Sequence, residues 1–426
     1  MNQLIIFFGK ILSKISKLLN LGHGSTWPGH IALKINPDFI SDLLRKSGTK
    51  VIFVTGTNGK TTTSKLIETI LVNNNKKVIT NSSGANLLNG IASSIIINNN
   101  FLGIATYDYV IFEIDENVLP LAAAKLEPDY IIALNLFRDQ LDRYGELDSI
   151  VKKWKKIYES LSRTTFLLNA DDPQIAFLGN NLKFVFYFGL NNVKIEHKNY
   201  QHASDSILCP KCGEKLVFDA FYFSHLGKWR CNNCGLARPK LSIEEFSYFP
   251  LSGTYAIYDT LAAVLLARIL NISDENIKKS LQKFIPAFGR QEKINLNGIF
   301  IQFFLSKNPT SFNESLRTIN QSSPKNLLMI LNDRIPDGTD VSWIWDIDFE
   351  TLISNKTKLY IAGDRVYDLA IRLKYAGIDI KNIFENLEEA VFAGLKNTNE
   401  NETFYILPTY SAMLETRKIL TGKKIL

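Results

Sequence analysis

The residues best suited to phosphate chemistry lie together in one short stretch. Residues 50–64 have the sequence KVIFVTGTNGKTTTS, in which an apolar, β-branched run ends at the turn Gly56–Gly59. Such glycines let consecutive backbone N–H groups point at one anion, while Lys60 reaches the outer phosphates and the Thr61 hydroxyl suits a magnesium ion. The general P-loop pattern has a glycine where this chain has Val54, so the match is to the shorter form G-x-x-G-K-T-T. A turn that merely caps a helix is the alternative.

Four cysteines form the second group with an informative spacing. Cys209 and Cys212 make one C-x-x-C pair, and Cys231 and Cys234 make another after eighteen intervening residues. Two such pairs at this separation predict a tetrahedral zinc ribbon, and four thiolate ligands leave no open position for catalysis. We therefore expect a structural ion. A nucleic-acid-binding ribbon and a redox site are the alternatives, and the aromatic but lightly basic stretch 215–229 argues against the first.

Carboxylates follow a strand that we expect beside the phosphate loop. The run YDYVIFEID at 107–115 is β-rich and contains Glu113 and Asp115, with Glu116 next. A magnesium-binding acid belongs at this carboxyl edge of the sheet, and we expect Glu113 to serve. Asp115 and Glu116 are alternatives, as is a solvated strand end without a metal. The polar run NLFRDQLDRYGE at 135–146 follows another strand and also indicates a site, or else a linker.

Alternating strands and helices must position these groups. We expect helices at 61–74 and about 256–269, and strands at 77–80, 107–115, 130–136, 164–169 and 183–188. This order is typical of a parallel, doubly wound sheet. A second set of strands is expected at 298–305, 326–331, 358–362 and 403–407. The sequence therefore predicts an α/β protein with a P-loop domain at 49–293, an inserted ribbon at about 195–250, and a smaller Rossmann-like α/β domain at 294–426.

The N-terminal segment, residues 1–48, is expected to be helical. Residues 22–30 resemble a loop, and residues 32–47 are expected to be mostly helical. Residues 1–21 repeat apolar side chains with a helical period, but lysines interrupt them every three or four residues. They therefore fit neither a transmembrane run nor a signal peptide. A helix at 1–20 packed on the P-loop domain is one interpretation, and a basic amphipathic helix in a membrane interface is the other.

Length and charge leave several classes of ligand open. The chain has 426 residues, of which 46% are hydrophobic, and this is ample for several packed cores. Its 49 Lys and Arg against 42 Asp and Glu give a net charge of +7. This mild bias suits anionic small ligands or a membrane surface as well as nucleic acid. Cysteines confined to the ribbon and the absence of a cleavable signal favour a reducing cytoplasm.

Taken together, these motifs resemble the Mur ligases, whose central domain carries the GTNGKTT loop, here Gly56–Thr62. Within that family the chain is most similar to the MurT subunits of lipid II isoglutaminyl synthases, which share the inserted cysteine ribbon. Four further motifs carry this similarity: FRDQLDRYGE at 137–146, NADDP at 169–173, SKNP at 306–309 and DGTDVSWIWD at 337–346. The resemblance spans nearly the whole chain.

The resemblance implies an ATP-dependent amidation. A MurT-type subunit uses ATP and magnesium to phosphorylate the α-carboxylate of the D-glutamate at position 2 of the lipid II stem peptide. Ammonia from a GatD-like glutaminase then displaces phosphate and yields D-isoglutamine. The expected location is the cytoplasm, at the inner face of the membrane, and no nucleic acid is expected to bind. The resemblance also implies a nucleotide site made of Thr57, Asn58, Gly59, Lys60, Thr61, Thr62, Asp259 and Arg290, although the family has asparagine where this chain has Asp259.

A second polypeptide is needed to supply the ammonia. A class I glutaminase uses a cysteine nucleophile and a histidine base, and an acid orients the histidine. All four cysteines of this chain are assigned to zinc, so the nucleophile must come from a partner. The resemblance places the missing acid at Asp340, and Trp343 and Trp345 are candidates for an apolar seat. The alternative is that Asp340 caps a helix that starts at Val341.

Two other functions fit parts of the sequence. A stand-alone amino-acid ligase of the Mur or folylpolyglutamate kind shares the loop and the sheets, but it needs neither the ribbon nor the DGTD segment. A nucleic-acid-binding ATPase would use the ribbon and the net positive charge, and its binding would depend on salt.

Overall fold

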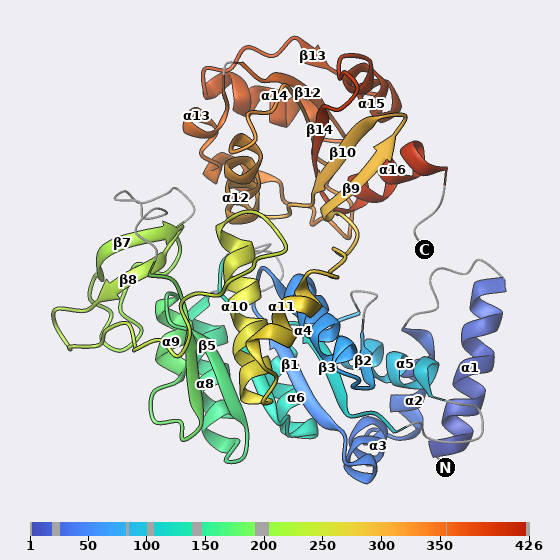
Figure 1. Cartoon of the computed structure of the whole chain (residues 1–426), viewed down its shortest axis with the longest axis vertical. Helices are drawn as coiled ribbons and strands as arrows, with labels where there is room; N and C mark the ends of the chain where they lie inside the picture. Colours follow the sequence, from blue (N-terminus) through green and yellow to red (C-terminus); the bar gives the residue numbers. More distant parts are fainter. Residues whose placement is uncertain are drawn as a thin grey trace.

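Two six-stranded sheets, one above the other in Figure 1, organise the chain. The structure is a computed structural model, in which helices α10 (Thr254–Ile269) and α12 (Pro309–Asn320) meet between the two halves. It describes residues 2–18, 26–81, 85–99, 106–138, 147–191, 204–354 and 356–422. Most of the polar run at 135–146 therefore lies outside the described residues, as do positions 82–84 and the first part of the predicted insertion.

The first sheet is parallel throughout, as predicted. Its order is β2-β3-β1-β4-β5-β6, and each strand runs parallel to its neighbours. Along β1, Val51 and Phe53 pack into one core, and Ile52 and Val54 into the other. Both faces are buried, which is why these strands are continuously apolar. The strands are β1 (Lys50–Thr55), β2 (Val78–Thr80), β3 (Tyr109–Ile114), β4 (Tyr130–Ala133), β5 (Thr165–Asn169) and β6 (Val185–Phe188).

Helices cover both faces of this sheet. One face is covered by α4 (Lys60–Asn73), α10 and α11 (Asp274–Leu281). The other is covered by α5 (Leu88–Asn98), α6 (Leu119–Leu126), α8 (Leu147–Ser160) and α9 (Pro173–Leu178). Because the strands are parallel, the segments that follow β1, β2, β3 and β4 all emerge at the same carboxyl edge.

The cysteine-containing insertion forms a separate antiparallel pair, β7 (Val217–Phe223) and β8 (Leu226–Arg230). It packs on α9, because Ala176 shares a small core with Trp229. The Trp229 indole also donates a hydrogen bond of 3.0 Å to the carbonyl oxygen of Ala170. The insertion therefore packs against the P-loop domain and is hydrogen-bonded to it.

The second sheet has the order β13-β12-β11-β14-β10-β9, and only its edge strand β9 is antiparallel to its neighbour. The predicted strands are β10 (Ile299–Phe304), β11 (Asn326–Ile330), β12 (Lys358–Ala362) and β14 (Thr403–Pro408). The sequence missed β9 (Arg290–Leu296), whose edge position leaves it half exposed, and β13 (Asn382–Ile383), which has two residues. Besides α12, the domain contains α13 (Phe349–Leu352), α14 (Val366–Tyr375), α15 (Leu387–Lys396), α16 (Tyr410–Thr421) and the 3-10 helix η2 (Ser342–Asp346).

Three helices precede the first sheet. They are α1 (Asn2–Leu18), which follows the expected helical period, α2 (Trp27–Ile35) and α3 (Phe39–Ser47). The expected loop at 22–30 is wrong for its last four residues, which are helical. Residues 32–47 are mostly helical, as expected, with an interruption between α2 and α3 that the sequence analysis did not specify.

Two prolines explain these differences. Pro28 lies in the first turn of α2, where a proline needs no hydrogen bond from its nitrogen. Pro37 disfavours a helical conformation at the residue before it, and Asn36 is extended, with φ −136° and ψ 101°. No helix in the described part of the chain is both long and apolar enough to cross a bilayer.

Candidate active site

A cavity of about 430 Å³ lies between the carboxyl edge of the first sheet and the second domain. Asp115 and Glu116 lie in its wall, as do Lys307 and Glu314 from the second domain. Every residue predicted to bind nucleotide or magnesium also lines it: Thr57, Asn58, Gly59, Lys60, Thr61, Thr62, Glu113, Asp259 and Arg290. The fold thus collects residues that are far apart in the sequence.

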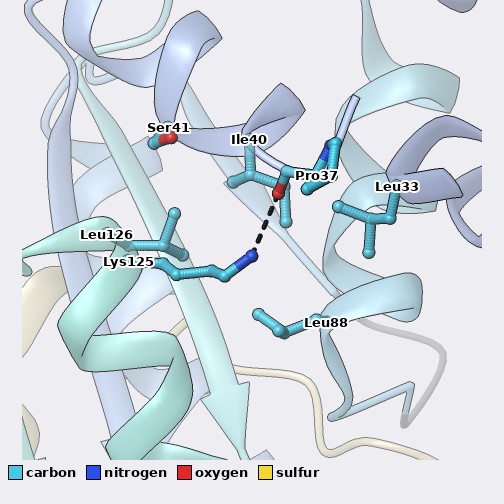
Figure 2. Close-up of a pocket in the computed structure, with 7 residues that line it drawn as sticks. All are labelled: Leu33, Pro37, Ile40, Ser41, Leu88, Lys125 and Leu126. Carbon is cyan, nitrogen blue, oxygen red and sulfur yellow. Dashed lines mark hydrogen bonds between the residues drawn. The ribbon is translucent and has the colours of Figure 1, made fainter. Parts of the chain in front are cut away.

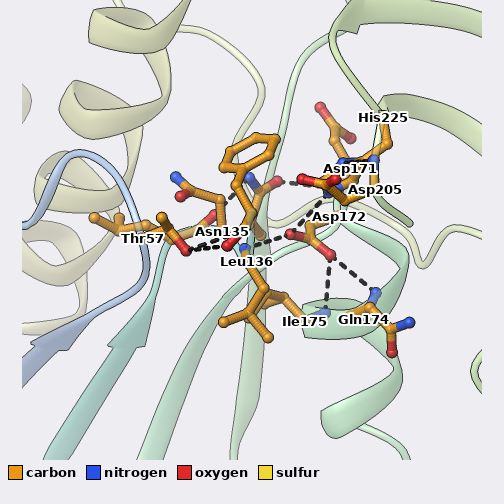
Figure 3. Close-up of polar contacts among 12 residues, drawn as sticks. Thr57, Asn135, Leu136, Asp171, Asp172, Gln174, Ile175, Asp205 and His225 are labelled. Carbon is orange, nitrogen blue, oxygen red and sulfur yellow. Dashed lines mark hydrogen bonds and ion pairs between the residues drawn. The ribbon is translucent and has the colours of Figure 1, made fainter. Parts of the chain in front are cut away.

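Asn135, two residues after the end of β4, holds the phosphate loop in place (Figure 3). The backbone nitrogen of Thr57 donates to Asn135 O and that of Asn58 to Asn135 Oδ1, both at 2.9 Å. Gly56 has φ 129°, and a Cβ there would lie 2.9 Å from both the nitrogen and the oxygen of Asn135. Only glycine fits so close an approach.

Lys60 starts helix α4 and lies inside the cavity wall. Its Nζ contacts Glu116 Oε1 at 2.8 Å and also donates to the carbonyl oxygen of Gly56. The first N–H groups of a helix have no partner within that helix, and the helix dipole makes this end favourable for an anion. The start of α4 therefore offers a phosphate group both backbone donors and a lysine charge.

Thr61 and Glu113 form a pair of oxygen groups next to the phosphate loop. Thr61 Oγ1 donates to Glu113 Oε2 at 2.9 Å. Burial raises the pKa of Glu113, while the Thr61 hydrogen bond, Arg290 and Lys60 oppose this shift. Asn81, after β2, braces the strand by accepting from the Glu113 nitrogen at 2.9 Å. A hydroxyl and a carboxylate so placed fit the oxygen ligands that magnesium prefers.

The other two acids of this edge are differently engaged. Glu116 is the ion-pair partner of Lys60, and Asp115 Oδ1 accepts from the backbone nitrogen of Asn117 at 3.0 Å. Glu113 is thus the acid whose side chain meets Thr61, the hydroxyl predicted for the metal. This geometry favours Glu113 over its two neighbours as the magnesium ligand.

Asp259 of α10 lies directly behind Gly59. A Cβ on Gly59 would be 2.1 Å from Asp259 Oδ1, so this loop position has no room for a side chain. Burial raises the pKa of Asp259 to about 8, and the Arg290 charge opposes the shift. A protonated carboxyl offers one donor and one acceptor, as an amide does. At neutral pH this aspartate can therefore present the same kind of groups as the asparagine expected from the family.

The second domain closes the cavity with residues that the sequence analysis did not assign. Asn308 Nδ2 donates to Asn58 Oδ1 at 3.1 Å, which links the two domains across the site. Burial raises the pKa of Glu314 to about 7, although Arg317 pairs with it at 2.6 Å. Asn308 and Lys307 belong to the SKNP motif, which could have indicated a site. Glu314 lies inside a helix with no such signal.

Asp340 lies outside this cavity. It lines a smaller neighbouring cavity of about 70 Å³, together with Lys307, which contacts both. Asp340 Oδ1 accepts a hydrogen bond of 2.8 Å from the backbone nitrogen of Ser342, at the start of η2. Helix η2 starts at Ser342, and its N-cap is Val341 without a side-chain cap bond, so Asp340 does not cap a helix starting at Val341. The contact with Ser342 is a local turn that uses one carboxylate oxygen of Asp340. Trp345 is about half exposed, whereas Trp343 packs on Phe312.

The tip of the ribbon hairpin supports the back of the site (Figure 3). His225 is fully buried between β7 and β8, with its Nε2 3.5 Å from Asp172 Oδ2. The same Asp172 oxygen accepts from the Leu136 nitrogen at 2.8 Å. Arg138 pairs with Asp205 and approaches Asp346 of the second domain at 3.7 Å. The insertion thus contacts the segment that holds the phosphate loop.

The four cysteines lie together at the ribbon knuckles, away from the cavity. Their Sγ atoms all lie within 4.8 Å of one another, and the pairs Cys209–Cys234 and Cys212–Cys231 are 3.6 and 3.5 Å apart. A zinc ion bound at about 2.3 Å in a tetrahedron requires sulfur atoms about 3.8 Å apart. The arrangement therefore fits the predicted closed zinc site.

Comparison with known proteins agrees with this fold. The Mur ligase middle domain model matches residues 54–267, and the MurT ligase C-terminal model matches residues 305–413. A pseudomurein peptide ligase type C from Methanothermus fervidus superimposes with a TM-score of 0.68, at 23% identity, over 89% of this chain and 80% of that one. MurF from Acinetobacter baumannii gives a TM-score of 0.64 at 18% identity, over 94% and 79%. The fold is that of a Mur ligase.

Relatives with similar sequences show to which group of Mur ligases the chain belongs. The lipid II isoglutaminyl synthase (glutamine-hydrolyzing) subunit MurT of Streptococcus pneumoniae is 32% identical, over 96% of this chain and 95% of that protein. The corresponding subunit of Staphylococcus aureus is 31% identical over the same shares. The chain belongs to the MurT family of Mur ligases. It is accordingly an ATP-dependent ligase of peptidoglycan synthesis.

Proposed function

We propose that the chain is the synthetase subunit of a lipid II isoglutaminyl synthase. It uses ATP to amidate the α-carboxylate of the D-glutamate at position 2 of the lipid II stem peptide. The observation that carries the proposal is the pairing of a phosphate loop with a second-domain wall in one cavity, in a chain of the MurT family. Neither a helix cap nor a structural turn accounts for that arrangement.

The chemistry requires two successive displacements. First, a carboxylate oxygen of the substrate attacks the γ-phosphorus of ATP, which gives an acyl phosphate and ADP. Ammonia then attacks the acyl carbon, phosphate leaves, and a proton is lost from nitrogen to give the amide. Phosphoryl transfer of this kind depends on positioning and electrostatics more than on covalent catalysis by the protein.

The residues of the cavity supply those electrostatics. The N–H groups at the start of α4 and the Lys60 ammonium bind and neutralise the phosphates, and Lys60 leaves Glu116 to do so. Arg290 adds positive charge beside Asp259. Thr61 and Glu113 would hold magnesium, which would supply further neutralisation of the phosphate charge. Zinc would be bound by the four cysteines, where it stabilises the ribbon.

Ammonia comes from a GatD-like glutaminase partner. Every cysteine of this chain belongs to the ribbon cluster, so a cysteine nucleophile must be on another polypeptide. Asp340 completes the partner's catalytic residues by orienting its histidine. Asp340 lines the small cavity together with Lys307, which also lines the nucleotide cavity. This supports a position for Asp340 between the partner's glutaminase site and the ATP site of this chain. The exposed Trp345 ring provides an apolar contact close by.

Co-expression with a candidate glutaminase tests the overall reaction. Mass analysis of lipid II should show conversion of an acid to an amide, dependent on ATP and glutamine. Incorporation of an amino acid instead of ammonia would favour a stand-alone ligase and contradict the proposal.

The Asp340→Asn variant tests the role of the partner. We expect it to suppress glutamine-dependent amidation while it spares amidation driven by free ammonium, because the synthetase cavity is unchanged. Equal survival or equal loss of the two activities would show that Asp340 does not serve the glutaminase.

Because lipid II is a membrane lipid, the reaction takes place in the cytoplasm at the inner membrane surface.

A further inference from the structure

Helix α1 is apolar on two opposite sides. Its inner side buries Ile5, Ile6 and Gly9 against the P-loop domain. Its outer side exposes Leu4, Phe7, Phe8 and Ile11, with Phe8 63% exposed. The outer residues are spaced i, i+3, i+4 and i+7, so they form one stripe along the helix. A helix that exposes large apolar side chains on its solvent side as well as burying them on its inner side offers an apolar surface for a further contact.

Helix α2 carries a second stripe. Trp27, Ile31 and Ile35 are spaced one helical turn apart and all are exposed, Trp27 by 60%. The two helices are in contact, since a Cβ on Gly9 of α1 would lie 3.6 Å from Pro28 Cβ. Two adjacent helices therefore expose large apolar side chains. We call the seven residues the N-terminal apolar surface: Leu4, Phe7, Phe8, Ile11, Trp27, Ile31 and Ile35.

The charged side chains of the two helices themselves have one sign, and the nearest acids in the sequence are Asp38 and Asp42, after α2. The first 37 residues contain four lysines, at positions 10, 14, 17 and 34, and no Asp or Glu. Lys14 and Lys34 are exposed on the two helices that carry the stripes. Apolar side chains flanked by lysines on helices that carry no acids match an anionic phospholipid interface, where nearby lysines are attracted to the lipid headgroups.

The surface is firmly attached to the domain that holds the active site. The Gly29 nitrogen of α2 donates to Ser93 Oγ of α5 at 2.8 Å. At the turn after α2, Lys125 Nζ donates to Pro37 O at 3.2 Å (Figure 2). Helix α5 in turn starts directly after Asn86 and Leu87, which line the nucleotide cavity. Whatever holds α1 and α2 therefore also positions one edge of the cavity.

We propose that the N-terminal apolar surface binds an anionic phospholipid bilayer and so holds the active site at the membrane. The inference deepens the proposed function, on which it rests for the lipid nature of the substrate. The bound state places Phe8 and Trp27 among the acyl chains near the headgroups and leaves the lysines beside the phosphates. A second copy of the chain is a poorer occupant, because two such helix pairs would bring lysines together with no acid of α1 or α2 to pair with them. A different protein partner is distinguished by the measurements below.

Vesicle binding tests the proposal independently of catalysis. The full chain, co-expressed with its glutaminase, is sedimented with vesicles of phosphatidylglycerol and phosphatidylcholine that contain no lipid II, and with pure phosphatidylcholine vesicles. We expect about tenfold stronger binding to the anionic vesicles, weakened by salt. Phe8→Glu should lower this binding by about tenfold. Phe392→Glu is the matched control, because Phe392 is a 54% exposed phenylalanine on α15 of the other domain.

A second measurement separates this inference from the proposed function. Phe8→Glu should slow amidation of lipid II embedded in vesicles but not of lipid II in detergent micelles, and its Tm should match that of the control. Equal binding to neutral and anionic vesicles, or equal binding by the two variants, would overturn the proposal. Self-association lost in Phe8→Glu without vesicle binding would overturn it in favour of a protein contact. Absence of amidation by every protein would refute the proposed function, while the vesicle result would still decide this one.

Discussion

The phosphate loop and the cysteine ribbon both use glycine turns to bring polar groups together, but those groups face a cavity in the loop and face one another in the ribbon. Each is a short stretch in which glycines with positive φ, such as Gly59 at 91° and Gly213 at 77°, turn several groups toward one ion. In the loop those groups face a cavity of about 430 Å³. In the ribbon the four sulfur atoms face one another within 4.8 Å. Donor groups that face a cavity can bind and activate a substrate. Four sulfur atoms that face one another leave no position for a substrate, so such a site can only stabilise the fold.

Replacing the loop lysine should break the open site most severely. Lys60→Ala removes the charge that neutralises the phosphates, and we expect ATP-dependent amidation to fall by about 10³-fold. The Tm should change little, because Lys60 packs no core. Lys65→Ala on the same helix is the control, since Lys65 pairs only with Glu68 in the described contacts. Near-normal amidation by Lys60→Ala in a steady-state assay would refute the assignment.

Opening the closed site should affect stability before chemistry. The wild type should contain one zinc ion per chain by metal analysis, and Cys231→Ser should contain much less. Because metal binding in such a site is coupled to folding, the variant should lose soluble yield and melt at a lower temperature. The soluble remainder should keep its amidation rate per molecule. A zinc-free wild type, or a Cys231→Ser protein of unchanged Tm, would contradict a structural zinc site.

The acids beside the loop allow the open site to be examined more closely. Glu113→Gln should lower magnesium-dependent turnover by about tenfold or more and raise the magnesium concentration needed for half-maximal rate, because it removes a ligand charge. Glu116→Gln keeps the Thr61 and Glu113 pair and should have the smaller effect. Titration of amidation rate against magnesium measures both variants. If Glu116→Gln is the more damaging, the metal ligand has been misassigned.

The smallest expected effect is the pH dependence of stability that comes from protonation of Asp259, which lies behind Gly59 of the phosphate loop. The pKa of Asp259 is raised to about 8 by burial, whereas the pKa of an aspartate in an unfolded chain is about 3.9. Between these values the folded state binds more protons, so the stability contribution of Asp259 falls as pH rises. Asp259→Asn removes that loss. The variant's Tm relative to wild type should therefore rise between pH 5 and pH 8.

An exposed aspartate provides the control of opposite sign. The Arg268 hydrogen bond lowers the pKa of Asp274, so its stabilising contribution is present at neutral pH and is lost as pH falls. Asp274→Asn should therefore lower the Tm at neutral pH, and the difference from wild type should shrink at low pH. Parallel pH profiles for Asp259→Asn and wild type would show that Asp259 is ionised when folded.

Local chemistry explains which features could be predicted from the sequence. The phosphate loop and the cysteine pairs lie within short stretches, and their spacing alone specifies the turn or the ligand set. The strands of the first sheet are continuously apolar because both faces are buried. The edge strand β9 and the break at Asn36 were missed, since the first is half exposed and the second depends on how Pro37 divides an otherwise helical pattern.

The sequence by itself determined the class of chemistry, the cluster of four cysteines and the α/β plan, because these depend on residue type and short spacing. The tertiary structure decided which groups meet across long separations. It brought Asn308 to within 3.1 Å of Asn58, Asp259 behind Gly59, and the ribbon's His225 to within 3.5 Å of Asp172. These contacts join segments from different strands and domains, and burial at the place where they meet sets the protonation of Asp259. Desolvation is a property of the folded surroundings, so no local pattern of residues contains it.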